Sequence, residues 1–524
     1  MRRERQAKDR ERRRGGRFAR VTATIGLCLA AAACAPSVPV PSGPPAELVL
    51  RGGRVVDPET GLDGLRDVAI EGGRIVAISQ MPLAGDRVVD VRGLVVAPGF
   101  IDLHRHDMTP LGQRFQVRDG VTTGLELEAG SYPVASLGTH APLDFAKRPL
   151  GNFGASTGHA WLRGQLLLGE DAASNIGDVY AHVLREGGGG GLDGPAFKEL
   201  LPDEQLPALR DGLRRGLEEG GLGIGLLLDY MSSAVSDAEL RVVFEVAAER
   251  GAPVFVHVRR GVAGDPTGLD EVLDLARETG APVHVCHVQS SAMGAIDTFL
   301  DRIRAARRDG VRVTTESFPY NAGSTAITAA VFDRDWQRIF GISYGDVQWA
   351  ETGEWLTEET WHDYRRRFPG GAVIHHYNRE EWTRVATLAP DVIVASDGLP
   401  VLSFDVAVPP FGIGTFGKVL RKYVREEESL SLMDALAKMT LGPARVLEDW
   451  APVFRRKGRV QVGADADLTV FDPDTVQDHA TFEEPFRAST GFEHVLVRGV
   501  FVVEHGEVVD GVAPGKRLLA RTSR

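Results

Sequence analysis

Cysteine is nearly absent from this sequence of 524 residues, which contains only Cys28, Cys34 and Cys286. The first two fall in an N-terminal leader, so the rest of the chain has a single thiol and cannot form an intrachain disulfide. We find no internal repeat, and the 61 glycines and 29 prolines are scattered through hydrophobic runs rather than gathered into tracts. With 43% hydrophobic residues, a chain of this length can bury a large core, which has to supply its stability.

Positive charge is scarce beyond the first twenty residues. Those twenty contain ten lysines and arginines against three acidic residues, whereas the whole chain has a formal net charge of −12. Without this basic segment the net charge is about −19, and so acidic a chain repels the phosphates of nucleic acids. We therefore expect a small-molecule substrate and no nucleic-acid partner. The sequence leaves the oligomeric state open.

The uncharged, largely apolar run at residues 21–33 is too short to span a bilayer, and it follows the basic segment as in a signal peptide. It ends in Ala-Ala-Ala-Cys34, which resembles a bacterial lipobox, whose cysteine becomes the lipidated first residue of the mature protein. We expect residues 1–34 to be such a leader. The protein would then be exported to the periplasm or cell envelope, with membrane attachment through a lipidated Cys34. Plain secretion and an uncleaved basic tail on a cytoplasmic enzyme are the alternatives.

The hydrophobic pattern changes twice after the leader. A linker rich in proline and serine (35–46) precedes short alternating strands at 47–97, and strand patterns return at 456–515. Between them, at 98–455, short apolar strands alternate with charged helical stretches, as in a parallel α/β sheet. We predict an α/β fold with a (β/α)₈ TIM-type barrel and a small β-sandwich domain formed by both chain ends.

A metal site is indicated by the segment APGFIDLHRHD, a buried-strand pattern that ends in two histidines. The period of two along a strand places Asp102, His104 and His106 on one face. In a barrel, side chains at the carboxyl ends of the strands face the reaction site, where two imidazoles can share a divalent metal. A bare His-x-His pair is usually structural, so ligands from other strand ends are needed.

Three other strand ends supply such ligands. The segment GAPVFVHVRRG carries His257, GAPVHVCHVQSS carries His287, and PDVIVASDGLP carries Asp397. Alternation separates His284 from His287, so we assign His287 to the site and expect His284 to be a packed or surface residue. A lone strand-end aspartate is more often a cap or turn residue, but the four strand ends together favour metal catalysis.

The chain resembles the amidohydrolase superfamily, and within it the branch of D-aminoacylases and N-acyl-D-glutamate deacylases. The resemblance covers nearly all of the chain after the leader, and its motifs include PGFIDLHRHD, DGVTTGLELEAG, GASTGHAWLRG, TTESFPYNAGST, VIVASDG and GADADLTVFDPDTV. It implies one or two zinc ions, with Asp397 as general base. It also makes His159 a candidate for assisting at the carbonyl, although a buried structural role is the alternative. The implied metal ligands are His104, His106, His257, His287 and Asp397.

One expected ligand is missing from the third barrel strand. D-aminoacylases have a cysteine ligand there, and the matching residue of this chain is Ala129. Glu126 and Glu128 share a strand face just before it, and a carboxylate can replace a thiolate as a zinc ligand. We predict that Glu128 is the ligand because it lies nearer the strand end. The alternatives are Glu126, or a glutamate that pairs with a barrel arginine instead.

The cationic residues that hold the substrate carboxylate in relatives are missing as well. Phe411 stands where the relatives have the arginine of His-Pro-Arg, and Gln289 stands where they have a lysine. Two histidines expected on the seventh strand point to opposite faces, so at most one of them reaches the pocket. The substrate-binding candidates are Arg259, Arg260, Ser324, which matches a substrate-facing serine of the family, and His376, with His375 as the alternative.

An aromatic stretch at 332–361, which includes Trp336, Phe340 and Trp349, is longer than a usual connection between barrel elements. We interpret it as a lid. A surface subdomain packed for stability is the alternative.

Together these residues predict a metal-dependent hydrolase of amide bonds, and the resemblance implies an N-acyl-D-amino acid, such as N-acyl-D-glutamate, as substrate. Zinc would lower the pKa of a water, while Asp397 takes its proton and passes it to the leaving amine. A cyclic-amide hydrolase of the hydantoinase or dihydroorotase kind, or a dipeptidase, would share the fold, but no strand-end lysine is present to become a carbamylated ligand. A lipid-anchored binding protein on a dead enzyme scaffold is the alternative from another class, and the full ligand set argues against it.

Overall fold

The computed structural model describes residues 45–139, 145–169, 172–179 and 192–520. The expected leader 1–34, with Cys34, and nearly all of the linker 35–46 lie outside these ranges. Among the helices within them, none combines the length and apolar character needed to cross a bilayer.

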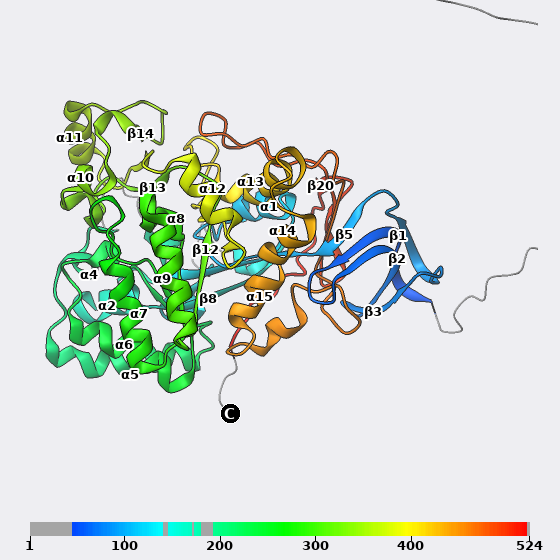
Figure 1. Cartoon of the computed structure of the whole chain (residues 1–524), viewed down its shortest axis with the longest axis horizontal. Coiled ribbons are helices and arrows are strands. Elements are labelled where there is room, and N and C mark those ends of the chain that lie inside the picture. The colour runs from blue at the N-terminus through cyan, green and yellow to red at the C-terminus, as the bar shows by residue number, and fades with distance from the viewer. Residues whose placement is uncertain (1–44, 140–144, 170–171, 180–191, 521–524) are drawn as a thin grey trace, which may run out of the picture. The chain divides into compact units, whose positions relative to one another are not determined.

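Eight strands form a parallel sheet in which each strand pairs with the next one of the set along the chain (Figure 1). This nearly closed sheet confirms the predicted barrel. Its strands are β6 (Phe100–Asp102), β7 (Val121–Ser131), β8 (Asn152–Gly158), β9 (Ile224–Leu226), β10 (Val254–Val256), β11 (Val283–Val285), β12 (Val313–Ser317) and β16 (Ile393–Val394).

Hydrogen bonds join the first barrel strand, β6, to the segment that follows the last, β16. The backbone N–H of Asp397 donates to the carbonyl of His104 (2.9 Å). The buried Asp102 carboxylate accepts hydrogen bonds from the backbone N–H (3.0 Å) and the hydroxyl (2.5 Å) of Ser396. Burial raises the pKa of Asp102 to about 6. These bonds hold the histidine pair after β6 beside the aspartate after β16.

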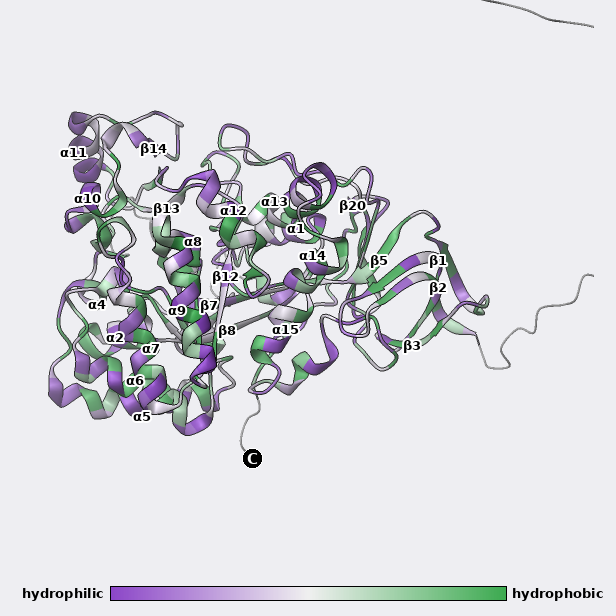
Figure 2. Cartoon of the chain, viewed as in Figure 1, coloured by the Kyte–Doolittle hydropathy of each residue, from purple (hydrophilic) through white to green (hydrophobic). Residues whose placement is uncertain are grey.

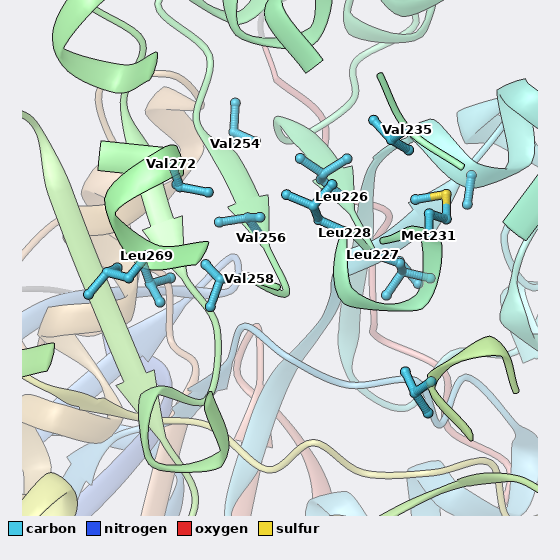
Figure 3. Packing of buried hydrophobic residues seen from close by; sticks show 14 of the residues in the cluster. Leu226, Leu227, Leu228, Met231, Val235, Val254, Val256, Val258, Leu269 and Val272 are labelled. Atoms are coloured by element: carbon cyan, nitrogen blue, oxygen red, sulfur yellow. The ribbon is translucent and has the colours of Figure 1, made fainter. Parts of the chain in front are cut away.

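Helices cover the outer face of the barrel and bury its apolar strand residues. Val254 and Val256 of β10 lie beside Leu269 and Val272 of α7 (Thr267–Thr279), as Figure 3 shows. A spacing of three places these two α7 residues on one helix face. Figure 2 shows hydrophobic and hydrophilic residues alternating along α5, α6 and α7, as expected for helices with one face on a core.

The helices differ in length, and the longest flank the barrel strands. The α-helices other than α7 are α1 (Pro110–Arg118), α2 (His159–Leu168), α4 (Pro195–Lys198), α5 (Leu206–Glu218), α6 (Asp237–Arg250), α8 (Val288–Ala292), α9 (Ile296–Arg308), α10 (Trp336–Phe340), α11 (Glu358–Arg367), α12 (Glu380–Leu388), α13 (Phe411–Lys418), α14 (Leu432–Met439) and α15 (Leu441–Leu447). A π-helix, η9 (Val419–Glu426), continues α13. Short 3₁₀ turns are η1 (Val134–Ser136), η2 (Phe145–Lys147), η3 (Asp203–Gln205), η4 (Asp229–Met231), η5 (Val262–Gly264), η6 (Met293–Ala295), η7 (Ala330–Asp333), η8 (Tyr344–Asp346) and η10 (Pro452–Arg456).

Both chain ends contribute to a separate, mostly antiparallel sheet, as predicted. Its N-terminal strand β5 pairs antiparallel with the C-terminal strand β17, while β4 and β5 pair parallel with β1. Residue contacts do not separate this sheet from the barrel, so the expected boundaries near 98 and 455 remain predictions. The strands are β1 (Ala46–Asp57), β2 (Leu62–Glu71), β3 (Arg74–Ser79), β4 (Gly85–Asp90), β5 (Val95–Pro98), β17 (Leu468–Phe471), β18 (Phe492–Val497), β19 (Val500–Glu504) and β20 (Glu507–Val508).

The aromatic stretch at 332–361 is part of a packed subdomain rather than a free lid. Trp336 and Trp361 are buried and stacked with ring centroids 4.8 Å apart. They lie beside a three-stranded antiparallel sheet of β13 (Gly323–Ala326), β15 (Ala372–His375) and β14 (Val347–Trp349). The structure therefore supports the alternative interpretation, because aromatic packing fixes this segment in place.

His159, at the start of α2, belongs to a buried ion-pair network. Its Nε2 lies 2.8 Å from Oε1 of Glu239, and Nη1 of Arg163 donates to both oxygens of Glu239 (2.6 and 2.5 Å). All three side chains are fully buried. His159 does not line the cavity described below, and its bond to Glu239 favours the structural role over the catalytic one.

We predict that Glu239→Ala lowers the free energy of unfolding by about 3–5 kcal/mol, because it leaves the buried Arg163 without its partner. Urea denaturation followed by circular dichroism measures this loss. As a control, Glu278→Ala removes an ion pair with Arg241 (2.9 Å) whose side chains are 55% and 49% exposed, so the midpoint should hardly change. Equal midpoints for the two variants would contradict the role of the network.

Candidate metal centre

Side chains from five barrel strands meet at the carboxyl end of the barrel. The structure thus brings together every residue that the sequence predicted as a metal ligand. All are buried except Asp397, whose side chain is 20% exposed. They are His104 and His106 after β6, Glu128 on β7, His257 after β10, His287 after β11 and Asp397 after β16.

The first group of ligand atoms comes from the two edges where the barrel closes. Nε2 of His104 and Nε2 of His106 are 3.2 Å apart. Oδ1 of Asp397 lies 3.4 Å from the former and 3.6 Å from the latter. Two imidazoles and one carboxylate at these distances could hold a zinc ion.

The second group, Glu128 with His257 and His287, lies beside the first. Oε1 of Glu128 lies 3.1 Å from Nδ1 of His257 and 2.8 Å from Nε2 of His287. Its other oxygen, Oε2, lies 3.3 Å from Nε2 of His104 and 3.5 Å from Nε2 of His106. One carboxylate therefore faces both pairs of histidines, which suits a ligand that bridges two ions.

Glu128 lies on β7, which is the second barrel strand and not the third as the sequence suggested. The strand number was wrong because β6 is the first strand of the closed sheet. Glu126, the alternative ligand, instead lies 3.0 Å from Nδ1 of His106, on the side of that ring away from the cluster. Neither glutamate pairs with a barrel arginine among the contacts of the described residues.

Hydrogen bonds to the outer ring nitrogens test whether a cation fits this cluster. Nδ1 of His104 lies 2.6 Å from Glu316, and Nδ1 of His106 lies 3.0 Å from Glu126, so each Nδ1 carries the proton. Both Nε2 atoms then present lone pairs to each other, which is repulsive unless a cation lies between them. Oε1 of Glu128 also has no hydrogen-bond donor. A metal ion fits this donor set.

The electrostatics of the centre agree with that fit. Burial alone would raise the pKa of Glu128, but the neighbouring imidazoles of His104, His257 and His287 hold it well below its usual range. Burial and the charge of Arg260 lower the pKa of His257 to about 3. Burial would lower the pKa of His104 and His106, but nearby carboxylates raise both, that of His106 to about 10. Zinc, which binds an ionised carboxylate and neutral imidazoles, would therefore displace protons from this pair.

Glu316, at the end of β12, links two histidines below the cluster. Its Oε1 lies 2.6 Å from His104, and its Oε2 lies 3.0 Å from Nε2 of His284. His284 is therefore a packed residue of the barrel interior, and the interpretation of it as a surface residue is wrong. The sequence analysis missed Glu316, although this residue lies in the motif TTESFPYNAGST that carries the family resemblance.

Backbone geometry explains how His287 reaches the cluster although His284 also points inward. His287 has a φ of 29° and Asp397 a φ of 56°, in the left-handed region that non-glycine residues rarely adopt. At both residues the chain leaves the strand direction, so the alternation of faces no longer applies. Strain of this kind gathers at functional sites.

A cavity opens beside the cluster and contains one buried arginine. Arg260 lines this cavity, whereas Arg259 pairs with Glu271 and does not. The guanidinium of Arg260 lies over the ring of Tyr377 (5.6 Å to the centroid). Its backbone N–H donates to Oδ1 of Asp229 (2.8 Å), and its Nη1 donates to Oδ2 (3.3 Å).

Asp229 was missed in the sequence, although it follows the apolar strand β9 and could have been found by the rule that identified the other strand ends. It also lies 3.7 Å from Nε2 of His257. Ser324 lines the cavity as expected, and its hydroxyl, like that of its neighbour Thr325, has no partner in the described structure. Two unpartnered hydroxyls of this kind suit a polar ligand.

His376 does not reach the cavity, so this substrate-binding candidate is wrong. It lies after β15, outside the barrel, and its Nε2 lies 2.8 Å from Oε1 of Gln348. His375, the alternative, lines the cavity, because its neighbour on the strand must point the other way. The seventh barrel strand is β12, and β15 belongs to the three-stranded sheet of the subdomain.

Known proteins share this combination of barrel and site. The model of the amidohydrolase family matches residues 87–503. The N-acyl-D-glutamate deacylase of Alcaligenes xylosoxydans xylosoxydans is 33% identical over 495 residues, which cover 87% of this chain and 93% of that enzyme. The chain belongs to the amidohydrolase family.

Two further comparisons cover most of this amidohydrolase. The D-aminoacylase of the same organism is 30% identical and covers 91% of this chain and 98% of that one. The structure of an N-acyl-D-glutamate deacylase from Bordetella bronchiseptica, solved with zinc and a phosphonate mimic of the tetrahedral intermediate, has a TM-score of 0.73 at 29% identity and covers 91% of this chain and all of that chain (100%). This amidohydrolase is a zinc-dependent enzyme, as the sequence predicted.

We predict that His257→Ala and Glu128→Ala each lower zinc affinity by at least about 100-fold. Mutating a residue that only hydrogen-bonds a metal ligand already lowers metal affinity by about 10- to 100-fold, and these two residues are ligands themselves. Metal analysis after dialysis against a weak chelator measures the loss. His376→Ala is the control, because that imidazole lies outside the cluster. Full zinc content in both site variants would refute the ligand assignment.

Proposed function

We propose that this amidohydrolase removes the acyl group from N-acyl-D-amino acids. The observation that carries the proposal is the presence of a metal-type ligand cluster, an open carboxylate and a buried guanidinium in one cavity. An N-acyl amino acid has the matching parts, namely a scissile amide and a carboxylate a few bonds away. The relatives named for action on N-acyl-D-amino acids support the D configuration.

We assign the zinc ligands to His104, His106, His257 and His287, with Glu128 between the two pairs and Asp397 beside the first. When bound, zinc acts as a Lewis acid that polarises the scissile carbonyl and makes water easier to deprotonate. Each oxygen of Glu128 faces a different pair of histidines, so Glu128 would help to hold zinc at either pair.

Asp397 is the proposed general base. It is the most exposed member of the cluster, at 20% against 3% for the Glu128 side chain, so water can reach its carboxylate. Its backbone bond to the carbonyl of His104 keeps that carboxylate at the metal side of the cavity. Asp397 accepts the proton of the attacking water and donates it to the nitrogen of the leaving amine.

Arg260 is the proposed anchor of the substrate carboxylate. A guanidinium binds a carboxylate through two parallel hydrogen bonds, and Nε of Arg260 has no partner of its own. Asp229 and the ring of Tyr377 hold the side chain in place. The hydroxyl of Ser324 is available as a further donor.

A cyclic-amide hydrolase is the second candidate for the same fold. A hydrolase of the hydantoinase or dihydroorotase kind is expected to use a carbamylated lysine as a metal ligand. Among the described residues that line the cavity there is no lysine, and Glu128 lies between the histidine pairs. The deacylase reaction is therefore preferred.

We also infer from residues 1–34 that the enzyme is exported as a lipoprotein anchored through Cys34. Support comes only from the basic segment, the apolar run and the lipobox-like Ala-Ala-Ala-Cys34. Mass spectrometry of the protein from its native membranes would detect a diacylated N-terminal cysteine, and a free N-terminus at any other residue would contradict the inference.

We predict that Asp397→Asn lowers kcat by at least about 100-fold while the protein keeps its fold and most of its zinc, because an amide cannot accept the proton. Steady-state kinetics and metal analysis on the same sample separate the two effects. A kcat close to that of the wild type would rule out the general-base role.

Arg260→Ala should raise KM for an N-acyl-D-amino acid by about 10- to 100-fold, because the substrate carboxylate loses a charge-assisted pair. The neighbouring Arg259→Ala provides a matched control, since Arg259 pairs with Glu271 outside the cavity. If the two variants have the same KM, the carboxylate is not bound at Arg260.

A further inference from the structure

We propose that the cavity selects N-acyl-D-amino acids with a nonpolar side chain, and that it discriminates against acidic ones. This inference rests on the proposed deacylase function and deepens it. It depends on the charges around Arg260 and on the apolar residues of the cavity wall.

The charges near Arg260 leave room for one anion. Asp229 is shared by two arginines, since Nη1 of Arg260 donates to its Oδ2 (3.3 Å) and Nη2 of Arg334 donates to its Oδ1 (2.8 Å). Two guanidinium groups and one carboxylate have a net charge of +1. The α-carboxylate of the substrate neutralises that charge, so a second carboxylate would find no further cation among the described residues of the cavity.

Apart from the carboxylates and histidines of the metal cluster, the other polar groups that the described residues present to the cavity are neutral. Burial and the charge of Arg260 lower the pKa of His375 well below its usual range, so its ring is uncharged near neutral pH. Ser324 and Thr325 offer hydroxyls, which can hydrogen-bond a carboxylate but cannot neutralise it. Arg260 is the only cationic side chain among the described residues that line the cavity.

Much of the remaining wall is aliphatic, beside Tyr230 and Tyr377. Five aliphatic side chains from separate parts of the chain line the cavity. They are Ile176, Leu192, Leu227, Val331 and Leu399. All five are less than 8% exposed, and Val331 is 1% exposed.

The substrate side chains differ in the free energy of transfer from water to this cavity wall. An aliphatic side chain gains on contact with this wall, whereas a carboxylate loses its hydration and meets no compensating charge. Discrimination by a missing polar partner is stronger than discrimination by size. A neutral amide of the same shape as a carboxylate should lie between the two.

Four substrates separate size, polarity and charge. N-acetyl-D-leucine and N-acetyl-D-asparagine have side chains of similar size, and N-acetyl-D-glutamine and N-acetyl-D-glutamate differ in charge alone. We expect kcat/KM to be about 10- to 100-fold higher for the leucine than for the asparagine substrate, and lowest for glutamate. Zinc-loaded full-length enzyme and release of the free amino acid provide the assay.

The results for the four substrates test the side-chain specificity and the deacylase function separately. If glutamate is turned over as well as or better than leucine, the specificity inference is wrong while the deacylase function stands. If none of the four is cleaved by zinc-loaded enzyme, the proposed function fails and the inference fails with it.

A pair of variants of the same chemistry tests the wall directly. Val331→Thr places a hydroxyl on the cavity wall with little change in volume, and it should reduce the leucine to asparagine ratio by about 3- to 10-fold. Val385→Thr is the matched control, because Val385 is 38% exposed on α12 and does not line the cavity. An unchanged ratio in Val331→Thr, with wild-type zinc content and melting temperature, would overturn the inference.

Discussion

The buried carboxylate of Glu128 is the constraint on which the centre depends. Each of its oxygens faces a different pair of imidazole nitrogens, so the cluster is stable only when positive charge lies among these groups. The barrel meets this requirement by ending five parallel strands at one place. Closure of the first strand on the segment after the last, through Asp102 and Ser396, then fixes the histidines of one edge beside the aspartate of the other.

Most of the barrel and all members of the cluster could be predicted from the sequence, because strand-end residues in a parallel sheet converge whatever the details of packing. Alternation along the strand gave a valid reason for His104 and for His257. Alternation also selected His287 correctly, but its premise that His284 faces away from the barrel interior was wrong. His287 reaches the cluster because its backbone turns into the left-handed region. A local period cannot anticipate such a turn, since tertiary contacts stabilise it.

Residues that act through distant partners could not be found in this way. Glu316 connects His104 with His284, and a single glutamate in a buried strand does not show which histidines of other strands it contacts. His375 is a similar case. It reaches the cavity because its strand, β15, pairs with β13 and β14 in the three-stranded sheet of the subdomain. His159 shows the reverse case, since a residue within a family motif proved to be bonded to a glutamate of another helix.

Asp229 gives the site a property that none of its parts has alone. Its carboxylate holds Arg260 and also lies 3.7 Å from the outer nitrogen of His257. A ligand that binds Arg260 changes the electrostatic field that Asp229 and Arg260 exert on His257. A metal ion bound to His257 in turn changes the interaction of Asp229 with Arg260. By thermodynamic reciprocity, whatever factor zinc contributes to substrate affinity, substrate contributes to zinc affinity. The enzyme would then retain its metal most firmly while it is at work.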